Sequence, residues 1–71
     1  MPTNVPIRGD MIRLSQFLKL AGAVDQGGEA KVLITAGEVT VNGEIDLRRG
    51  AQLHDGDVVA LGGEEWRVAA G

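Results

Sequence analysis

Several features that this 71-residue sequence lacks limit its function before any motif is considered. It has no cysteine, which excludes disulfide bonds and cysteine-ligated metal sites. Its one histidine, His54, has no second histidine with which to form a zinc site. No apolar run approaches the roughly 20 residues that span a bilayer, and the first residues lack the charged and then apolar pattern of a secretory signal. We therefore expect a cytoplasmic protein that is stabilised by apolar packing alone.

Positive charge is also scarce, because seven Lys and Arg residues stand against ten Asp and Glu, a net charge of −3. This balance counts against indiscriminate phosphate binding, which depends on excess positive charge. The charges are unevenly distributed, however. Met11 to Leu53 is neutral, whereas His54 to Gly71 carries four acidic residues and one basic residue. The sequence thus indicates a neutral body with an acidic C-terminal part, which leaves room for a local basic cluster.

Two short amphipathic helices are predicted in the first half of the chain. Each has apolar residues at the three- and four-residue offsets that place side chains on one helical face. We expect Ser15 to cap the first helix and Gly22 to end it, whereas the second helix follows Gly27-Gly28 and ends at Gly37. The apolar faces are Leu14, Phe17, Leu18 and Ala21 in the first helix and Ala30, Leu33 and Ile34 in the second.

Short strands are predicted in the second half of the chain. Apolar residues alternate with polar ones over Val39–Ile45, around Asn42-Gly43, the strongest short hairpin-turn signal. After a polar turn at His54–Asp57, a strand is predicted over Val58–Leu61. A last strand follows Gly62-Gly63 and places Trp66 and Val68 on one face.

The domain organisation follows from these elements. Residues 1–10 are predicted to be an irregular N-terminal arm, because Pro2 and Pro6 lack backbone donors and no apolar period surrounds them. Residues 11–71 then form a single domain, in which Met11–Leu14 is a short strand that leads into the first helix. The predicted fold class is α+β, with two short helices followed by a small, mostly antiparallel sheet.

Catalysis and metal binding find little support in the sequence. Nucleophilic catalysis needs an activated nucleophile with a base beside it, and His54 stands in a polar turn typical of a solvated residue. Asp55 and Asp57 are two candidate cation ligands, but a tight turn uses the same residues and calcium needs about six to eight oxygens. Gly27-Gly28 fits either a phosphate cradle or a flexible helix start. We predict a protein that is not an enzyme and has neither metal nor cofactor.

Basic side chains avoid the apolar helical faces. On a helical wheel, Arg13, Gln16 and Lys19 fall away from the first apolar face, and Lys31 falls away from the second. These side chains are free to contact a ligand, although such charges are usually a solvated surface. From composition and spacing, both interpretations remain open.

Four motifs follow one another between Arg13 and Asp57: Arg13-Leu14-Ser15, Glu29-Ala30-Lys31 with Leu33-Ile34, Gly37-Glu38-Val39-Thr40-Val41-Asn42-Gly43, and Gly56-Asp57. In this order they resemble the RNA-binding domain of the ribosomal small-subunit protein four type, also called the alpha-L RNA-binding motif. Single-domain bacterial members of the YbcJ type are similar over further segments. These are Gln16–Gly22, Gly27–Lys31 and Arg48-Arg49-Gly50.

The resemblance implies a non-catalytic module that binds structured RNA through a basic helix-helix and hairpin surface. Ribosomal RNA, its precursor and transfer RNA are the candidate partners. The implied contact residues are Arg13, Gln16, Lys19, Gln26, Gly27, Lys31, Val41, Asn42, Gly43, Arg48 and Arg49.

The chain departs from the family pattern at several of its polar positions. Gln26-Gly27 stands where the wider family usually has Ser-Arg, and Glu44 stands where it often has a basic residue. Gln52 replaces a lysine common in the YbcJ type. We therefore expect weak RNA binding that is sensitive to salt.

Two other interpretations remain open. A ubiquitin-like sulfur-carrier protein is similar through Val41–Glu44 and Leu53–Val59, but its tail ends in Gly-Gly, whereas this chain ends in Ala69-Ala70-Gly71. In a protein-interaction module, the acidic segment Asp55–Glu65 and the edge of the last hairpin would engage a partner chain. Trp66 either stacks on a base or packs on the sheet, and we expect it to pack, as large aromatics usually do.

Overall fold

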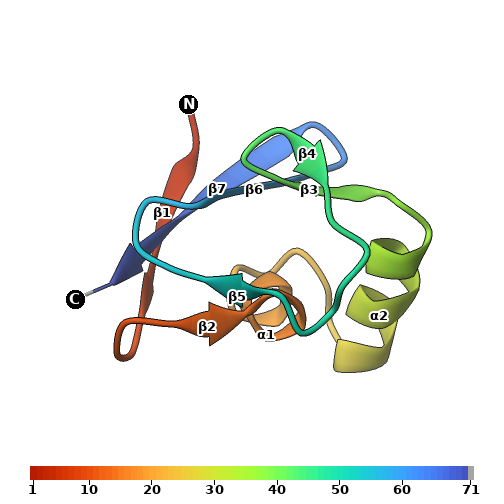
Figure 1. Cartoon of the computed structure of the whole chain (residues 1–71), viewed down its shortest axis with the longest axis horizontal. Coiled ribbons are helices and arrows are strands. Elements are labelled where there is room, and N and C mark those ends of the chain that lie inside the picture. Colours follow the sequence, from red (N-terminus) through yellow and green to blue (C-terminus); the bar gives the residue numbers. More distant parts are fainter. Residues whose placement is uncertain (71) are drawn as a thin grey trace.

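The computed structural model describes residues 1–70, apart from the surroundings of Gly27, and shows two short helices beside a five-stranded sheet (Figure 1). The helices are α1 (Leu14–Leu20) and α2 (Gly27–Thr35). The sheet has the order β1-β7-β6-β3-β4, and β2 and β5 form a separate pair. The strands are β1 (Thr3–Ile7), β2 (Ile12–Arg13), β3 (Val39–Val41), β4 (Glu44–Ile45), β5 (Gln52–Leu53), β6 (Val58–Leu61) and β7 (Glu64–Ala70). The predicted α+β class is confirmed.

Residues 3–7 correct the expectation of an irregular N-terminal arm. They form β1, which runs parallel to β7 from Thr3 opposite Trp66 to Ile7 opposite Ala70. Val5 and Ile7 are buried, whereas Pro6 is exposed. A proline is tolerated here because β1 is at the edge of the sheet, where one side of the strand has no partner. The prolines therefore mark an edge strand, not irregular structure.

The start of α1 also differs from the expectation. The helix begins at Leu14, so Ser15 lies within its first turn and makes no capping hydrogen bond. The amides of Leu14 and Ser15 donate instead to the carbonyls of Ala51 and Arg49, at 2.9 and 3.0 Å. Amides in the first turn of a helix have no partner within the helix. The segment 49–51 supplies the missing acceptors, which makes a side-chain cap unnecessary.

Both helices end at the predicted glycines, Gly22 and Gly37, which have φ angles of 77° and 79°. The Gly22 amide donates to the Lys19 carbonyl, and the next amide, of Ala23, donates to the Leu18 carbonyl. This is the Schellman arrangement, and the end of α2 repeats it. The start of α2 is earlier than predicted, because both Gly27 and Gly28 belong to the helix instead of preceding it.

The β3–β4 hairpin forms around Asn42-Gly43 as predicted. The two residues have φ angles of 53° and 86°, and Val41 pairs with Glu44 across the turn. Positive φ at both central residues is what a type I′ turn requires. Thr40 pairs with Ile45, so Ile45 lies on the outer face and is 64% exposed, although its apolar character had placed it in the alternating strand pattern. The antiparallel pairing of β2 with β5 was not predicted from the sequence.

The core lies between the helices and the inner face of the sheet. Its fully buried side chains come from α1, α2 and four strands and include Leu14, Phe17, Ile34, Val59 and Val68. Trp66 is 7% exposed, which confirms that it packs in the core and leaves it unable to stack on a bound base. No helix in residues 1–70 has the length and apolar character needed to cross a membrane.

The edge strand gives a test of the fold. Ile7→Ala is expected to lower the free energy of unfolding by about 2–5 kcal/mol, because it removes a buried side chain from the core. Asn4→Ala, in the same strand but exposed, should change it by less than about 0.5 kcal/mol. Urea denaturation followed by Trp66 fluorescence measures both. Equal midpoints for the two variants would show that residues 3–7 do not pack as β1.

Candidate nucleic-acid interface

The segment between β4 and β5 is fixed to the start of α1 by side-chain as well as backbone contacts. Arg13 occupies the position before the first helical residue, and its Nη1 donates to the Gly50 carbonyl at 2.9 Å. Its backbone pairs with Gln52 in the β2–β5 ladder. A guanidinium has five N–H donors, so this bond leaves most of them available. Arg13 thus holds the segment in place and still presents positive charge.

Arg13 and Arg48 line one hollow of about 440 Å³, together with Gly50–Gln52 and His54. The structure therefore brings together two of the predicted contact residues that are far apart in sequence. His54 was predicted to be a solvated turn residue, and its side chain is indeed exposed. It nevertheless lines the same hollow. The β2–β5 pairing is the signal that would have placed His54 next to the arginines.

Arg48 is engaged by an acidic neighbour. Its Nε and Nη2 donate to Oδ1 and Oδ2 of Asp46, at 3.2 and 3.1 Å, and its backbone amide donates to Oδ1 at 2.9 Å. The hydrogen bonds from the Arg48 side chain lower the pKa of Asp46, and the same pair raises the pKa of Arg48. A guanidinium binds phosphate with the same two-point geometry. Asp46 therefore orients Arg48 and also competes with any phosphate for it.

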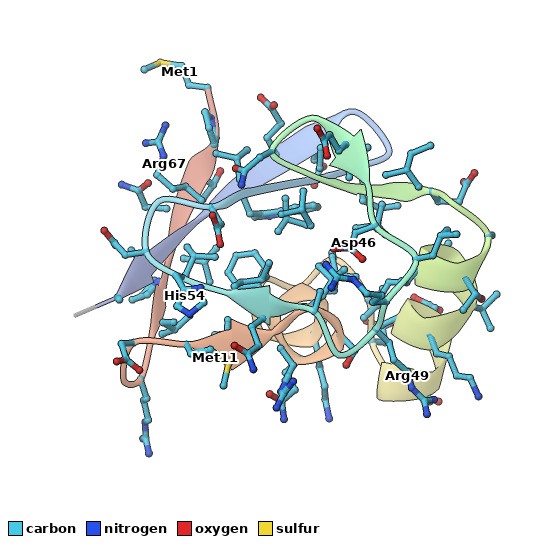
Figure 2. All side chains as sticks on the ribbon, in the orientation of Figure 1. Met1, Met11, Asp46, Arg49, His54 and Arg67 are labelled. Carbon is cyan, nitrogen blue, oxygen red and sulfur yellow. The ribbon has the colours of Figure 1, made fainter. Side chains whose placement is uncertain are left out.

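The remaining predicted cations are exposed. Lys19 on α1, Lys31 on α2 and Arg49 in the loop form no ion pair with another residue in the part of the chain that the structure describes. The Arg49 carbonyl accepts the Ser15 amide, which places this residue at the start of α1. Figure 2 shows Arg49 and Arg67 at opposite ends of the molecule. Arg67 thus provides a basic residue that lies away from the predicted surface.

Two of the predicted contact residues lie at the start of α2. Gln26 is exposed, and its carbonyl accepts the amides of Glu29 and Ala30 in the first turn of the helix. Gly27 was also predicted as a contact, but the structure does not describe how exposed this residue is. The contact role of Gln26 remains a prediction.

The Asn42-Gly43 turn does not line the hollow that Arg13 and Arg48 share. Asn42 donates from Nδ2 to Oδ1 of Asp57 at 3.1 Å and accepts the Val58 amide on its Oδ1 at 2.9 Å. These bonds tie the turn to the start of β6, at the end of β3 away from α2 (Figure 1). Val41 is half-buried and, with Arg48, lines a second hollow of about 400 Å³. The hairpin thus lies next to the segment between β4 and β5, which we call the basic loop, through Val41. The Asn42 side chain is already hydrogen-bonded to Asp57 and Val58.

The acidic turn His54–Asp57 has a structural role. Asp57 accepts the His54 amide at 2.8 Å, and Asp55 accepts the Ala70 amide at 2.9 Å. Within residues 1–70, no three or more His, Asp and Glu side chains cluster where they could hold a metal ion. The two aspartates that the sequence offered as cation ligands are therefore already hydrogen-bonded to the backbone.

The fold and the position of its basic loop define a small α+β module of the alpha-L type. The chain belongs to the S4 domain family, whose model matches residues 5–69. It is similar to the probable ribosome maturation protein RlbA of Bacillus subtilis, at 48% identity over 63 residues and 89% of each chain. It is also similar to the putative RNA-binding protein YbcJ of Escherichia coli, at 32% identity over 59 residues, covering 83% of this chain and 84% of the relative.

Two solved structures also match this chain. The solution structure of YbcJ from Escherichia coli, described as revealing a motif involved in RNA-binding, matches with a TM-score of 0.74 and 27% identity over 99% of this chain and 90% of that chain. The crystal structure of the 30S ribosomal protein S4e from Thermoplasma acidophilum has a TM-score of 0.63 and 24% identity over 82% of this chain and 31% of its own. The second likeness shows a shared fold.

The Asn42 bonds generate a stability test. Asn42→Ala is expected to lower the free energy of unfolding by about 2–3 kcal/mol, because it removes two side-chain hydrogen bonds. It also places alanine at a positive φ angle, a backbone conformation that is strained for residues with a Cβ atom. Asn42→Gly removes the same bonds but suits the turn, so a smaller loss is expected. Urea denaturation checks the order of the two. An Asn42→Ala protein as stable as the wild type would contradict the structural role of this side chain.

Proposed function

We propose that this chain is a non-catalytic RNA-binding module that recognises structured RNA through a basic surface on α1, α2 and the segment between β4 and β5. The observation that carries the proposal is the anchoring of residues 49–51 to the first amides of α1. This contact holds Arg13 and Arg48 around one hollow, next to the exposed residues of the helix. Membership of the S4 domain family and the likeness to YbcJ support the same function.

The chemistry of the surface fits folded RNA. Double-stranded and folded RNA is recognised mostly by shape and by its phosphates, and guanidinium groups bind phosphate at two points. Ribosomal RNA or its precursor is the first candidate partner, because a relative at 48% identity is named a probable ribosome maturation protein. Transfer RNA is the second candidate. An RNA of this kind implies a place in the cytoplasm.

The two alternative functions have less support. A sulfur carrier needs a flexible C-terminal tail, but Glu64–Ala70 forms β7, which lies between β1 and β6; Gly71 is outside the described residues. A protein partner for the acidic part would meet Glu64 and Glu65, which are exposed. Asp55 and Asp57, however, are hydrogen-bonded within the fold. We therefore keep a protein partner as a secondary proposal.

RNA binding is tested by fluorescence anisotropy of a labelled RNA hairpin across a salt series. If about four phosphates are contacted, the logarithm of affinity should fall against the logarithm of salt with a slope of about −3 on the single-strand scale and somewhat steeper on the duplex scale. The variant with Lys31→Glu, Arg48→Glu and Arg49→Glu should lose binding, because each change replaces an attraction to phosphate by a repulsion. Arg49→Glu alone should weaken binding more than Arg67→Glu, which makes the same charge change at the other end of the molecule. No binding by the wild type, or equal effects of these two single variants, would contradict the proposal.

The Asp46–Arg48 pair gives a second test in the same assay. Asp46→Asn is expected to raise RNA affinity about two- to fivefold, because phosphate no longer competes with a carboxylate for Arg48. The gain should be largely absent in an Arg48→Ala background, as a double-mutant cycle would show. Glu64→Gln, which removes one negative charge on β7, serves as the control for net charge. A loss of affinity in Asp46→Asn would instead show that orientation of Arg48 outweighs competition.

A further inference from the structure

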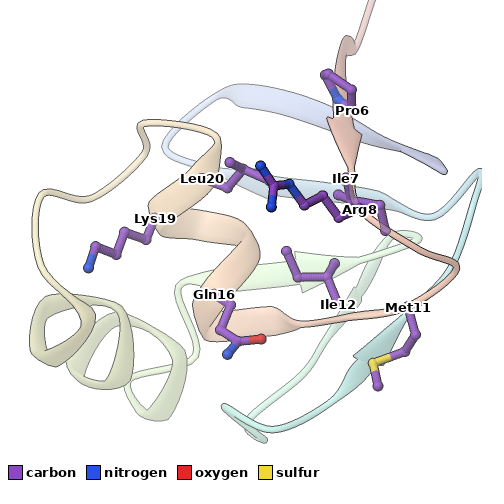
Figure 3. Close-up of a pocket in the computed structure, with 8 residues that line it drawn as sticks. All are labelled: Pro6, Ile7, Arg8, Met11, Ile12, Gln16, Lys19 and Leu20. Carbon is purple, nitrogen blue, oxygen red and sulfur yellow. The ribbon is translucent and has the colours of Figure 1, made fainter. Parts of the chain in front are cut away.

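A further concave feature is larger than the two hollows described above and shares none of their lining residues. It is an open groove of about 880 Å³ between the end of β1, the start of β2 and the outer side of α1 (Figure 3). Ile7, Met11, Ile12 and Leu20 give it an apolar lining. Its volume lies within the range of roughly 300–1,000 Å³ that is typical of small-ligand sites. Leu20 is 53% exposed although it is a large aliphatic residue, so the groove offers apolar surface that the fold itself does not cover.

The polar side chains of the groove favour an anionic ligand. Arg8, Gln16 and Lys19 line it, and no carboxylate does. Figure 3 shows the Arg8 side chain extending across the groove toward Leu20, whereas Lys19 extends outward from its rim. Within residues 1–70, Arg8 forms no ion pair and no side-chain hydrogen bond. A cation above an apolar surface fits a ligand that has both a flat, weakly polar part and a negative charge.

An unpaired nucleotide has both parts. Bases that leave a helix stack on aromatic side chains or on guanidinium planes. Phe17 and Trp66 are buried, and the exposed imidazole of His54 lines the hollow beside Arg13, not this groove, so no aromatic ring is available here. The exposed guanidinium of Arg8 is a planar group that extends toward Leu20 at the groove. Gln16 adds an amide that can hydrogen-bond a base edge, and Lys19 adds a charge for the adjoining phosphate.

We propose that this groove binds one unpaired nucleotide of the RNA, with its base between the Arg8 guanidinium and the aliphatic side chains of Ile12 and Leu20. The proposal rests on the RNA-binding function proposed above. Gln16 and Lys19 belong to both surfaces, so the groove continues the basic face of α1 onto residues 6–12. The preferred RNA is therefore a duplex with an unpaired nucleotide beside it, not a continuous stem.

The test compares two labelled RNA hairpins that differ only by one bulged adenosine next to the stem. We expect the wild type to bind the bulged RNA about five- to tenfold more tightly, in line with the binding energy of a stacked base. Leu20→Ser should remove this preference and leave affinity for the continuous stem unchanged. Val32→Ser is the matched control, because Val32 is a 64% exposed aliphatic residue on α2 that does not line the groove.

Arg8 is tested separately, with Arg67→Gln as the control for charge. Arg8→Gln should also remove the preference for the bulged RNA, whereas Arg67→Gln should retain it. In ¹H–¹⁵N spectra, the bulged RNA should shift the amide signals of Met11, Ile12 and Leu20 more than the continuous stem does. Urea midpoints close to that of the wild type establish that each variant is folded.

The outcomes distinguish the two proposals. If the wild type binds both hairpins equally, or if Leu20→Ser keeps the preference, the groove does not bind a nucleotide and the RNA-binding proposal is unaffected. If the wild type binds neither hairpin, both proposals are wrong. If the preference is lost in Leu20→Ser and Arg8→Gln but kept in both controls, the groove is the site of the unpaired nucleotide.

Discussion

The first amides of α1 have no acceptors within the helix, and the chain satisfies them with the carbonyls of Arg49 and Ala51. An unsatisfied backbone donor away from water is costly, so the loop and the helix are held together by a requirement of the backbone that any sequence must meet. The positions of Arg13 and Arg48 follow from this contact. The basic surface is therefore held together by backbone hydrogen bonds, which offset the mutual repulsion of its arginine and lysine side chains.

The net charge of −3 is compatible with a basic surface because most of the acidic side chains lie elsewhere or form hydrogen bonds within the fold. Asp55 and Asp57 accept backbone amides in a turn, and Asp46 holds one arginine. Two other acidic residues, Glu64 and Glu65, are exposed on β7, which is separated from β4 by β6 and β3. The net charge of the whole chain thus says little about the local electrostatic potential at the segment between β4 and β5. It does imply that the long-range attraction of this protein for RNA is weak.

The sequence predicted the parts of the fold that local signals determine. The apolar spacing gave both helices, the glycines at 22 and 37 gave their ends, and Asn42-Gly43 gave the hairpin. It did not predict β1, because Pro2 and Pro6 hide the strand pattern and its partner β7 is remote in sequence. It also did not predict the β2–β5 pair, which joins two very short strands that are remote in sequence. The same limit applied to the site: Arg13 and Arg48 were chosen from the family resemblance, but His54 and Arg8 reach their surfaces through remote pairings that no local pattern shows.

The parallel pairing of β1 with β7 has a consequence for biosynthesis. Thr3 lies opposite Trp66, so during synthesis β1 has no partner strand until β7 has been made. Contacts between such distant segments slow folding, because the loop must close before any stabilisation is gained. During translation Val5 and Ile7 remain uncovered, and Pro6 between them discourages pairing with other nascent chains. The sheet, and with it the wall of the groove beside Arg8, is therefore complete only after β7 has been synthesised.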